Sequence, residues 1–119
     1  MGKILIVDDS RTSRKILRVI LEEAGNEVIG EATNGQEAFE MYKELKPDVV
    51  TLDITMPVLD GVGALKLIKE FDDNAKIVMV TAAGQKGNVV EAIKLGAFEF
   101  VTKPFDDAVI LDVINKALS

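Results

Sequence analysis

Five polar side chains stand at or directly after the ends of short, β-branched apolar runs: Asp8, Asp9, Asp53, Thr81 and Lys103. If these runs are parallel strands of one sheet, their carboxyl ends lie at the same edge and the five groups converge there. Three carboxylates and one ammonium leave a formal charge of −2 at that edge. One divalent cation would balance this charge.

A single aspartate at a strand end is usually a solvated loop residue, and Asp8 with Asp9 taken alone fits that interpretation equally well. Three carboxylates from two separate strands fit it poorly. At ~4 Å and an effective dielectric constant of ~20, two like charges repel by about 4 kcal/mol. A fold therefore gathers three of them only with a bound cation or a raised pKa. Carboxylates, a main-chain carbonyl and water are oxygen ligands suited to Mg²⁺, with Mn²⁺ as a substitute.

With a cation at this edge, Lys103 and Thr81 can also take part in binding an anionic group. Mg²⁺, the Lys103 ammonium and the Thr81 hydroxyl form a cradle for the three equatorial oxygens of a phosphoryl group. A carboxylate at its centre can act as the nucleophile and become an acyl phosphate. Asp53 is the candidate nucleophile because it closes a central strand, whereas Asp8 and Asp9 are adjacent and better placed to hold the metal.

The elements that must position these groups alternate along the chain as (βα)5. Between strand-like runs, apolar residues recur at three- and four-residue spacing, which predicts five helices. Strands that alternate with helices pair in parallel through right-handed crossovers. The predicted fold class is therefore α/β, a doubly wound three-layer sandwich. The expected strands are Lys3 to Val7, Glu27 to Glu31, Val49 to Asp53, Ile77 to Thr81 and Phe98 to Thr102.

The predicted helices have recognisable ends. The first ends at Gly25, and Asn34 is the expected N-cap of the second, which ends before Pro47. The fourth ends at Gly96, and the fifth spans about Asp107 to Leu118. The residues expected to face the sheet are Ile16, Leu17, Ile20, Leu21 and Ala24 in the first helix, Ala38, Met41, Tyr42 and Leu45 in the second, Ala64, Leu65, Ile68 and Phe71 in the third, and Val89, Val90 and Ile93 in the fourth.

The composition excludes several kinds of chemistry. A chain of 119 residues allows one domain, residues 1–119, and we expect no effector domain on it. The absence of cysteine and histidine excludes disulfides, thiolate or imidazole metal sites and catalytic pairs with histidine. A net charge of −6 argues against nucleic acid. The apolar run before Asp8 is only four residues long, too short for a signal peptide or a membrane span, so we expect a soluble, cytoplasmic protein. We also expect a monomer.

Five motifs of the chain are Asp8-Asp9 after Ile-Leu-Ile-Val, Asp53 in Leu-Asp-Ile-Thr-Met-Pro, Asp60-Gly61, Thr81-Ala82 and Lys103-Pro104-Phe105. Together they resemble the receiver domain of two-component response regulators, and the resemblance covers essentially the whole chain. Within that family, residues 31–35, 43–48 and 53–57 are most similar to single-domain chemotaxis regulators of the CheY type. The resemblance implies a flavodoxin-like sheet with strand order 2-1-3-4-5.

The resemblance also implies a role for each site residue. Asp53 would accept the phosphoryl group, and Asp9 with Asp53 would bind Mg²⁺ directly. Asp8 would act largely through metal-bound water, and the main-chain carbonyl of Thr55 would complete the protein ligands. Lys103 would pair with the phosphoryl oxygen opposite the metal.

Thr81 and Phe100 would be the switch residues of such a domain. Thr81 would move to hydrogen-bond the phosphoryl group, and Phe100 would swing inward behind it. Phe100 stands where many relatives carry tyrosine, and its pattern fits an ordinary core residue of a buried strand equally well. The bond between Lys103 and Pro104 would be a cis peptide. Thr55 stands where many relatives carry asparagine or an acid, on the path of attacking water, which leaves the lifetime of the phosphorylated state open.

The fifth helix is more apolar than one buried face needs, which predicts an exposed patch. In receiver domains the face formed by the fourth helix, fifth strand and fifth helix is the output surface, and a wide core stripe is the competing interpretation. The helix has two apolar stripes: one contains Val109, Ile110, Val113, Ile114 and Ala117, and the other contains Leu111, Ile114 and Leu118. The residues assigned to the output surface are Val90, Phe100, Val109, Ile110 and Val113.

Two further features allow a functional and an ordinary interpretation. Gly84 and Gly87 flank the start of the fourth helix, where they indicate either a segment that phosphorylation orders or a simple loop. The basic residues of the first helix could dock on an acidic kinase surface, although a solvated face with an Arg18 to Glu22 pair is the simpler interpretation. These basic residues are Arg11, Arg14, Lys15 and Arg18.

The site residues and the family resemblance together imply a signalling switch and not a turnover enzyme. By that resemblance, a histidine kinase would donate the phosphoryl group, a phosphatase would remove it, and output would pass to a partner such as a flagellar motor switch protein. The alternatives are a phosphorelay intermediate and a receiver cut from a longer regulator. An aspartate-nucleophile phosphatase would need an acid where Thr55 stands, and in a flavin carrier Asp8 and Asp9 would repel the cofactor phosphate. No nucleic acid or membrane partner is expected.

Overall fold

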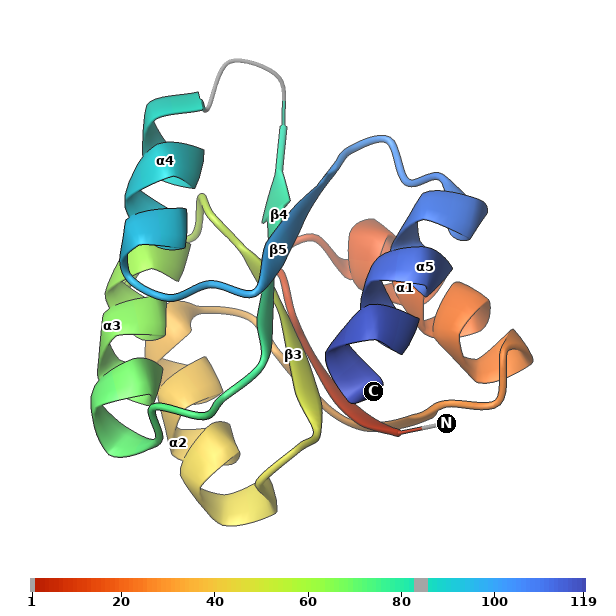
Figure 1. The fold of residues 1–119 in the computed structure, drawn as a ribbon, viewed down its shortest axis with the longest axis horizontal. Helices are drawn as coiled ribbons and strands as arrows, with labels where there is room; N and C mark the ends of the chain where they lie inside the picture. The colour runs from red at the N-terminus through yellow and green to blue at the C-terminus, as the bar shows by residue number, and fades with distance from the viewer. Residues whose placement is uncertain (1, 83–85) are drawn as a thin grey trace.

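The computed structural model describes residues 2–82 and 86–119, in which strands and helices alternate strictly (Figure 1). The strands are β1 (Lys3–Val7), β2 (Glu27–Ala32), β3 (Val49–Asp53), β4 (Ile77–Thr81) and β5 (Glu99–Thr102). The helices are α1 (Arg11–Glu23), α2 (Gly35–Leu45), α3 (Gly61–Phe71), α4 (Lys86–Lys94) and α5 (Asp107–Leu118).

All five strands pair in parallel, in the order β2-β1-β3-β4-β5. Helices α1 and α5 cover one face of the sheet, and α2, α3 and α4 cover the other (Figure 1). The predicted α/β class, the three-layer sandwich and the strand order 2-1-3-4-5 are confirmed. The order reverses between β1 and β3, so the carboxyl ends of these strands flank the crevice where ligands of such sheets bind.

Each face of the sheet carries its own core. Because strands covered on both faces bury every side chain, β3 and β4 are buried at each position and β1 from Ile4 onward. Alternate residues point to opposite faces, so Leu5 and Leu52 pack under α2 and α3, while Ile6 and Val78 pack under α1 and α5.

The helix ends follow local capping chemistry. Asn34 caps α2 as predicted, since its Oδ1 accepts a hydrogen bond from the Glu37 amide at 2.9 Å. Ser10, Asp60 and Asp106 cap α1, α3 and α5 in the same way. Two predicted strand ends differ by one residue: β2 extends to Ala32, and β5 begins after Phe98, although the Phe98 amide already donates to the Ile77 carbonyl.

The predicted buried faces of the helices were too wide. Ile16 in α1 and Phe71 in α3 are 47% and 49% exposed. In α4, Val90 and Ile93 are also exposed, and Ala92 is buried instead. A helix that lies on one face of a sheet buries a single stripe, so apolar residues at its margins remain in solvent.

No helix among the described residues is both long enough and apolar enough to cross a membrane. Gly84 lies outside the described residues. Gly87 lies in α4, where an added Cβ would meet nothing within 4 Å, so packing does not require a glycine there.

Candidate functional site

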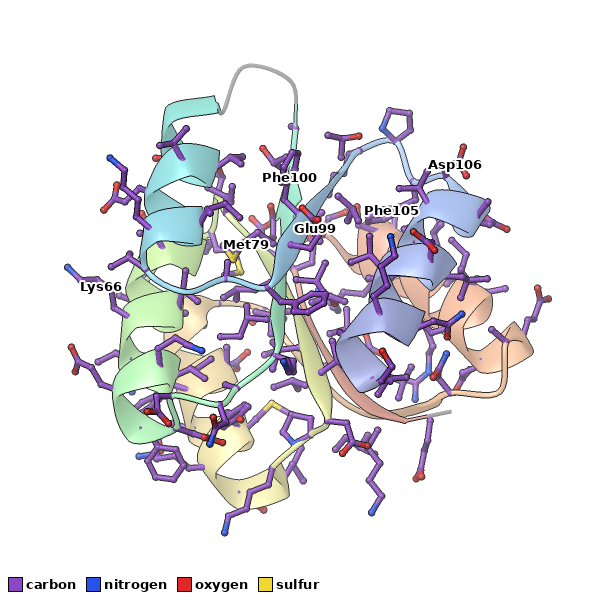
Figure 2. The ribbon with its side chains drawn as sticks, viewed as in Figure 1. Lys66, Met79, Glu99, Phe100, Phe105 and Asp106 are labelled. Carbon is purple, nitrogen blue, oxygen red and sulfur yellow. The ribbon has the colours of Figure 1, made fainter. Side chains whose placement is uncertain are left out.

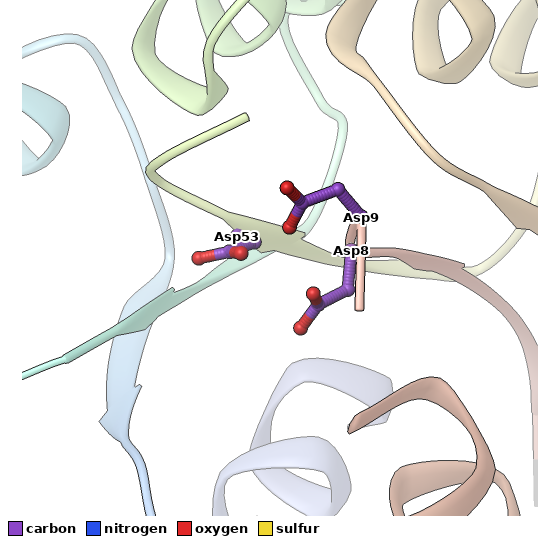
Figure 3. A group of neighbouring side chains, drawn as sticks. All are labelled: Asp8, Asp9 and Asp53. Carbon is purple, nitrogen blue, oxygen red and sulfur yellow. The ribbon is translucent and has the colours of Figure 1, made fainter. Parts of the chain in front are cut away.

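Three carboxylates meet at the carboxyl edge of the sheet (Figure 3). Asp8 and Asp9 follow β1, and Asp53 ends β3; each offers an oxygen, and these oxygens all lie within 4.8 Å of one another. The register explains the meeting, because Val7 pairs with Leu52 and the next residue of each strand is an aspartate. Asp8 and Asp53 are 3% and 6% exposed, whereas Asp9 is open to solvent.

Asp8 is held through all of its polar groups. Its amide donates to the Ala32 carbonyl at 3.0 Å, and its Oδ1 accepts from the Ser10 amide at 2.8 Å. Its Oδ2 lies 2.9 Å from Lys103 Nζ, and its carbonyl accepts from Arg14 Nη1 at 2.7 Å. The first carboxylate of the cluster is therefore fixed before any ligand binds.

Lys103 reaches the cluster from the loop after β5. Its Nζ lies 3.6 Å from Asp53 Oδ2, in addition to its contact with Asp8, and its amide donates to the Thr81 carbonyl at 2.9 Å. The following bond to Pro104 is cis, the geometry that the family resemblance implies. Burial opposes the charge on Lys103, but the hydrogen bond with Asp8 and the charge of Asp53 outweigh it and raise the pKa of the ammonium.

The Asp53 carboxyl has a raised pKa. Burial, followed by the charge of Asp8, raises the pKa of its carboxyl to about 6, although Lys103 and the Thr55 amide partly oppose that shift. One ammonium therefore does not neutralise three carboxylates in this arrangement. A bound cation would relieve the repulsion.

At Gly61, where α3 begins, the chain passes so close to the backbone of Asp53 and Ile54 that no side chain fits. The Gly61 amide donates to the Ile54 carbonyl at 2.8 Å, and a Cβ on Gly61 would lie 2.1 Å from the Asp53 carbonyl oxygen. The loop between Asp53 and α3 is also tied to α2, because the Gly35 amide donates to the Leu59 carbonyl at 2.8 Å. These two glycines fix the path of the loop that carries Thr55, which is exposed.

Thr81 ends β4, one residue beyond Val80, which pairs with Asp53. It is 4% exposed, and its hydroxyl donates to the Ala82 carbonyl at 3.1 Å. The sheet thus brings Thr81 to the same edge as Asp53 and Lys103. Its predicted movement toward a phosphoryl group stays a prediction.

Phe100 is not a core residue, so its interpretation as an ordinary side chain of the core was wrong. It lies on β5 opposite Met79, and its side chain is 40% exposed (Figure 2). Val90 on α4 and Val109 on α5 are also exposed, at 54% and 51%. Its predicted inward swing stays a prediction.

Two residues assigned to the exposed output surface were assigned wrongly. Ile110 and Val113 are 2% and 8% exposed and pack in the core between α5 and the sheet, together with Ile114. Periodicity showed two apolar stripes on this helix but could not show which one faces the sheet. Leu111 and Leu118, of the second stripe, are partly buried against the same core.

The basic residues of α1 do not form one solvated face. Arg18 does pair with Glu22, at 3.4 Å, but it also bonds Glu31 on β2. Arg14 is largely buried, bonds Glu31 and donates to the Asp8 carbonyl. No pattern in the sequence indicated this link to the acidic site, because a contact between a helix and a strand leaves no local signal.

The donor set is suited to a hard divalent cation. The cluster supplies carboxylate oxygens that follow two strands, burial and then the charge of Asp8 raise the pKa of Asp53, and one of the acids faces solvent. Asp8, Asp9 and Asp53 could therefore hold a metal ion.

A parallel sheet in this order, with an acidic cluster and a lysine at its carboxyl edge, has the architecture of a receiver domain. Residues 4–115 match the family model of the response regulator receiver domain, and the chain belongs to that family.

Within the family, the chain is similar to chemotaxis regulators. It is 54% identical to the chemotaxis protein CheY of Thermotoga maritima over 117 residues, which cover 98% of each chain. It is 50% identical to the chemotaxis protein CheY of Bacillus subtilis, again with 98% of each chain covered. The crystal structure of the CheX-CheY-BeF3-Mg²⁺ complex from Borrelia burgdorferi matches with a TM-score of 0.93 at 39% identity, covering 98% of this chain and 89% of that one.

Proposed function

We propose that this protein is a phosphorylation-activated switch in chemotaxis, and that Asp53 accepts its phosphoryl group from a histidine kinase. The observation that carries the proposal is the buried Asp53 carboxylate, which lies 3.6 Å from Lys103 and within one oxygen cluster with Asp8 and Asp9. The similar CheY from Borrelia burgdorferi has been crystallised with beryllofluoride and Mg²⁺, which supports phosphoryl chemistry at the matching edge.

In the proposed transfer, an oxygen of ionised Asp53 attacks the phosphorus atom. The bond between phosphorus and the kinase imidazole nitrogen breaks, and the leaving nitrogen keeps the electron pair. Asp8, Asp9, Asp53 and the Thr55 carbonyl would hold Mg²⁺, which supplies charge stabilisation for the transferred oxygens when it is bound. Lys103 neutralises a phosphoryl oxygen from the other side, so it must exchange part of its contact with Asp8 for one with the new group.

The output of the proposed switch is binding to another protein. Thr81 would turn toward the phosphoryl group, and Phe100, now partly exposed on β5, would move inward. This movement would change the face formed by α4, β5 and α5, where Val90 and Val109 stand in solvent. The proposed partner is a flagellar motor switch protein, and a phosphatase would reset the switch.

We do not propose a turnover enzyme. A phosphatase that uses an aspartate nucleophile needs an acid near the leaving group, and Thr55 occupies the second position after Asp53. Transfer from Asp53 to a second histidine protein, without binding to a motor component, would favour a phosphorelay role instead.

The proposal is tested by measuring intact mass after brief incubation with acetyl phosphate, with and without Mg²⁺. We expect one added phosphoryl group that requires Mg²⁺ and is lost in Asp53→Asn. Asp72→Asn is a matched control, since it removes a carboxylate that lies after α3 and accepts its hydrogen bonds from Tyr42 and Asn74. A stoichiometric adduct in Asp53→Asn would contradict the assignment of the acceptor.

A further inference from the structure

Arg14 connects α1 to the backbone of the acidic site. It lies in the first half of the helix, and its side chain is 14% exposed. Nη1 donates to the carbonyl oxygen of Asp8 at 2.7 Å, while Nε donates to Glu31 Oε1 at 2.9 Å. The guanidinium therefore bridges a strand-end carbonyl and a carboxylate on the neighbouring strand.

Glu31 orients this guanidinium from β2. It accepts from Arg14 and Arg18 with different oxygens, and Arg18 is itself paired with Glu22 at 3.4 Å. The hydrogen bond from Arg18, followed by the contacts from Arg14, lowers the pKa of Glu31, so this acceptor remains ionised near neutral pH. The Arg14 guanidinium is therefore held by two acceptors, Glu31 and the Asp8 carbonyl.

The carbonyl that Arg14 holds belongs to the peptide that joins Asp8 to Asp9. The other side of Asp8 is already fixed, because its amide donates to the Ala32 carbonyl at 3.0 Å. Rotation of the Asp8–Asp9 peptide would move the exposed Asp9 carboxylate relative to Asp8 and Asp53. The bond from Arg14 opposes that rotation.

We propose that Arg14 is a positioning residue that fixes the Asp8–Asp9 peptide and thereby holds the Asp9 carboxylate where the divalent cation needs it. The inference rests on the proposed Mg²⁺ site. Removal of such an outer contact in a metal site typically weakens metal binding ~10- to 100-fold.

Charge and position predict opposite effects of removing Arg14. An arginine near a cation site repels the cation, so its loss would tighten Mg²⁺ binding if charge were its only influence. Loss of the bond to the Asp8 carbonyl weakens binding instead. The direction of the change therefore distinguishes the two roles.

The experiment compares the Mg²⁺ dissociation constants of the wild type, Arg14→Lys, Arg14→Ala and Arg11→Ala, measured by competition with Mn²⁺ in electron paramagnetic resonance. Arg14→Lys keeps the charge but replaces the guanidinium, whose Nε and Nη1 reach Glu31 and the Asp8 carbonyl separately, by a single ammonium nitrogen, and we expect binding weakened about tenfold. Arg11→Ala removes an exposed arginine of the same helix and should leave the constant unchanged or slightly lower. Arg14→Ala should weaken binding despite the loss of a positive charge.

A second measurement needs no metal. In the metal-free protein, Arg14→Lys should shift the Asp8 carbonyl ¹³C and Asp9 amide ¹⁵N resonances, while the resonances of β4 stay in place. Unchanged or tighter Mg²⁺ binding in Arg14→Lys would overturn the positioning role. A wild type that binds no Mg²⁺ would overturn the proposed metal site itself, so the two failures are distinguishable.

Discussion

The aspartates at the two edges of the sheet differ in the hydrogen-bond donors that surround them. At the amino edge, Asp48 Oδ2 accepts from the Lys3 amide at 2.8 Å, and the Asp48 amide returns a bond to the Lys3 carbonyl. Asp72, after α3, accepts from the Tyr42 hydroxyl at 2.9 Å and from the Asn74 amide at 3.0 Å. Each of these acids has its own donors. At the carboxyl edge three carboxylates offer oxygens within 4.8 Å of one another, and two of them, Asp8 and Asp53, share Lys103.

The acids at the amino edge stabilise the fold, whereas the acids at the carboxyl edge lower its stability and serve the function of the site. A carboxylate with its own neutral donors strengthens a loop. A buried carboxylate beside two others opposes folding unless a ligand relieves it. The contrast predicts opposite signs for substitutions at the two edges.

The largest effect on the free energy of unfolding is expected for Asp53→Asn in the presence of EDTA. The pKa of Asp53 is raised from 3.8 to about 6 in the folded chain, so ionised Asp53 costs ~2–3 kcal/mol of stability at pH 7. The wild type therefore loses this stability as the pH rises through about 6. Urea unfolding should show Asp53→Asn more stable by about that amount at pH 7, and by almost nothing near pH 4, where wild-type Asp53 is protonated.

Two controls sharpen this result. Asp48→Asn at the amino edge should give no gain at either pH, since its carboxylate faces main-chain donors and solvent. Saturating Mg²⁺ should reduce the difference between wild type and Asp53→Asn, because the cation favours the ionised carboxylate. A wild type more stable than Asp53→Asn at pH 7 in EDTA would contradict the crowded-acid explanation.

Much of this contrast could be predicted from the sequence. The period of the apolar residues gave the five strands and helices, and parallel pairing alone required Asp8 and Asp53 to end at the same edge. The N-cap at Asn34 followed from local chemistry. These features depend on neighbouring residues or on the alternation of elements.

The rest depends on how separate elements are rotated against each other. The burial of Ile110 and Val113 and the exposure of Ile16 follow from the rotation of α5 and α1 on the sheet, which two apolar stripes do not decide. The contact of Arg14 with Glu31 joins residues 17 apart, on a helix and the next strand. Such long-range register is fixed by packing and leaves no periodic signal.

A smaller effect of the opposite sign is expected at the amino edge for Tyr42→Phe. The ring is buried and packs edge-on against Phe71 at 6.3 Å, so phenylalanine keeps the packing and loses the bond to Asp72. We expect a loss of ~1 kcal/mol at pH 7 in urea unfolding. Mg²⁺ binding should not change.

The pH dependence provides a second check on Tyr42. Burial and the nearby Asp72 raise the pKa of the Tyr42 hydroxyl, so its stabilisation is present below pH ~10 and declines at higher pH, where the unfolded chain ionises. The wild type should therefore lose its advantage over Tyr42→Phe above that pH. A variant as stable as wild type at pH 7 would mean that the bond to Asp72 contributes nothing to the amino edge.

The last comparison is between two residues with positive φ, one at each edge of the sheet. Lys46 ends α2 at the amino edge with φ 46° and ψ 61°, whereas Val58 lies in the loop after Asp53 with φ 69°. The Leu59 amide donates to the Pro57 carbonyl at 2.8 Å, which makes Val58 the centre of a γ-turn. A β-branched residue in this conformation costs ~1–3 kcal/mol, more than a lysine does.

Substituting glycine at Val58 and at Lys46 tests whether backbone strain in the loop after Asp53 serves phosphorylation, since Lys46 only ends a helix. Val58→Gly should raise the free energy of unfolding by ~1 kcal/mol, after the greater entropy of glycine in the unfolded chain is subtracted, and Lys46→Gly should change it by less than about half of that. Because Val58 lies in the same loop as Thr55, the gain should be accompanied by slower phosphorylation from acetyl phosphate, measured by intact mass. Equal gains at both positions, with unchanged phosphorylation, would show that the carboxyl edge carries its excess strain only in its charges and not in its backbone.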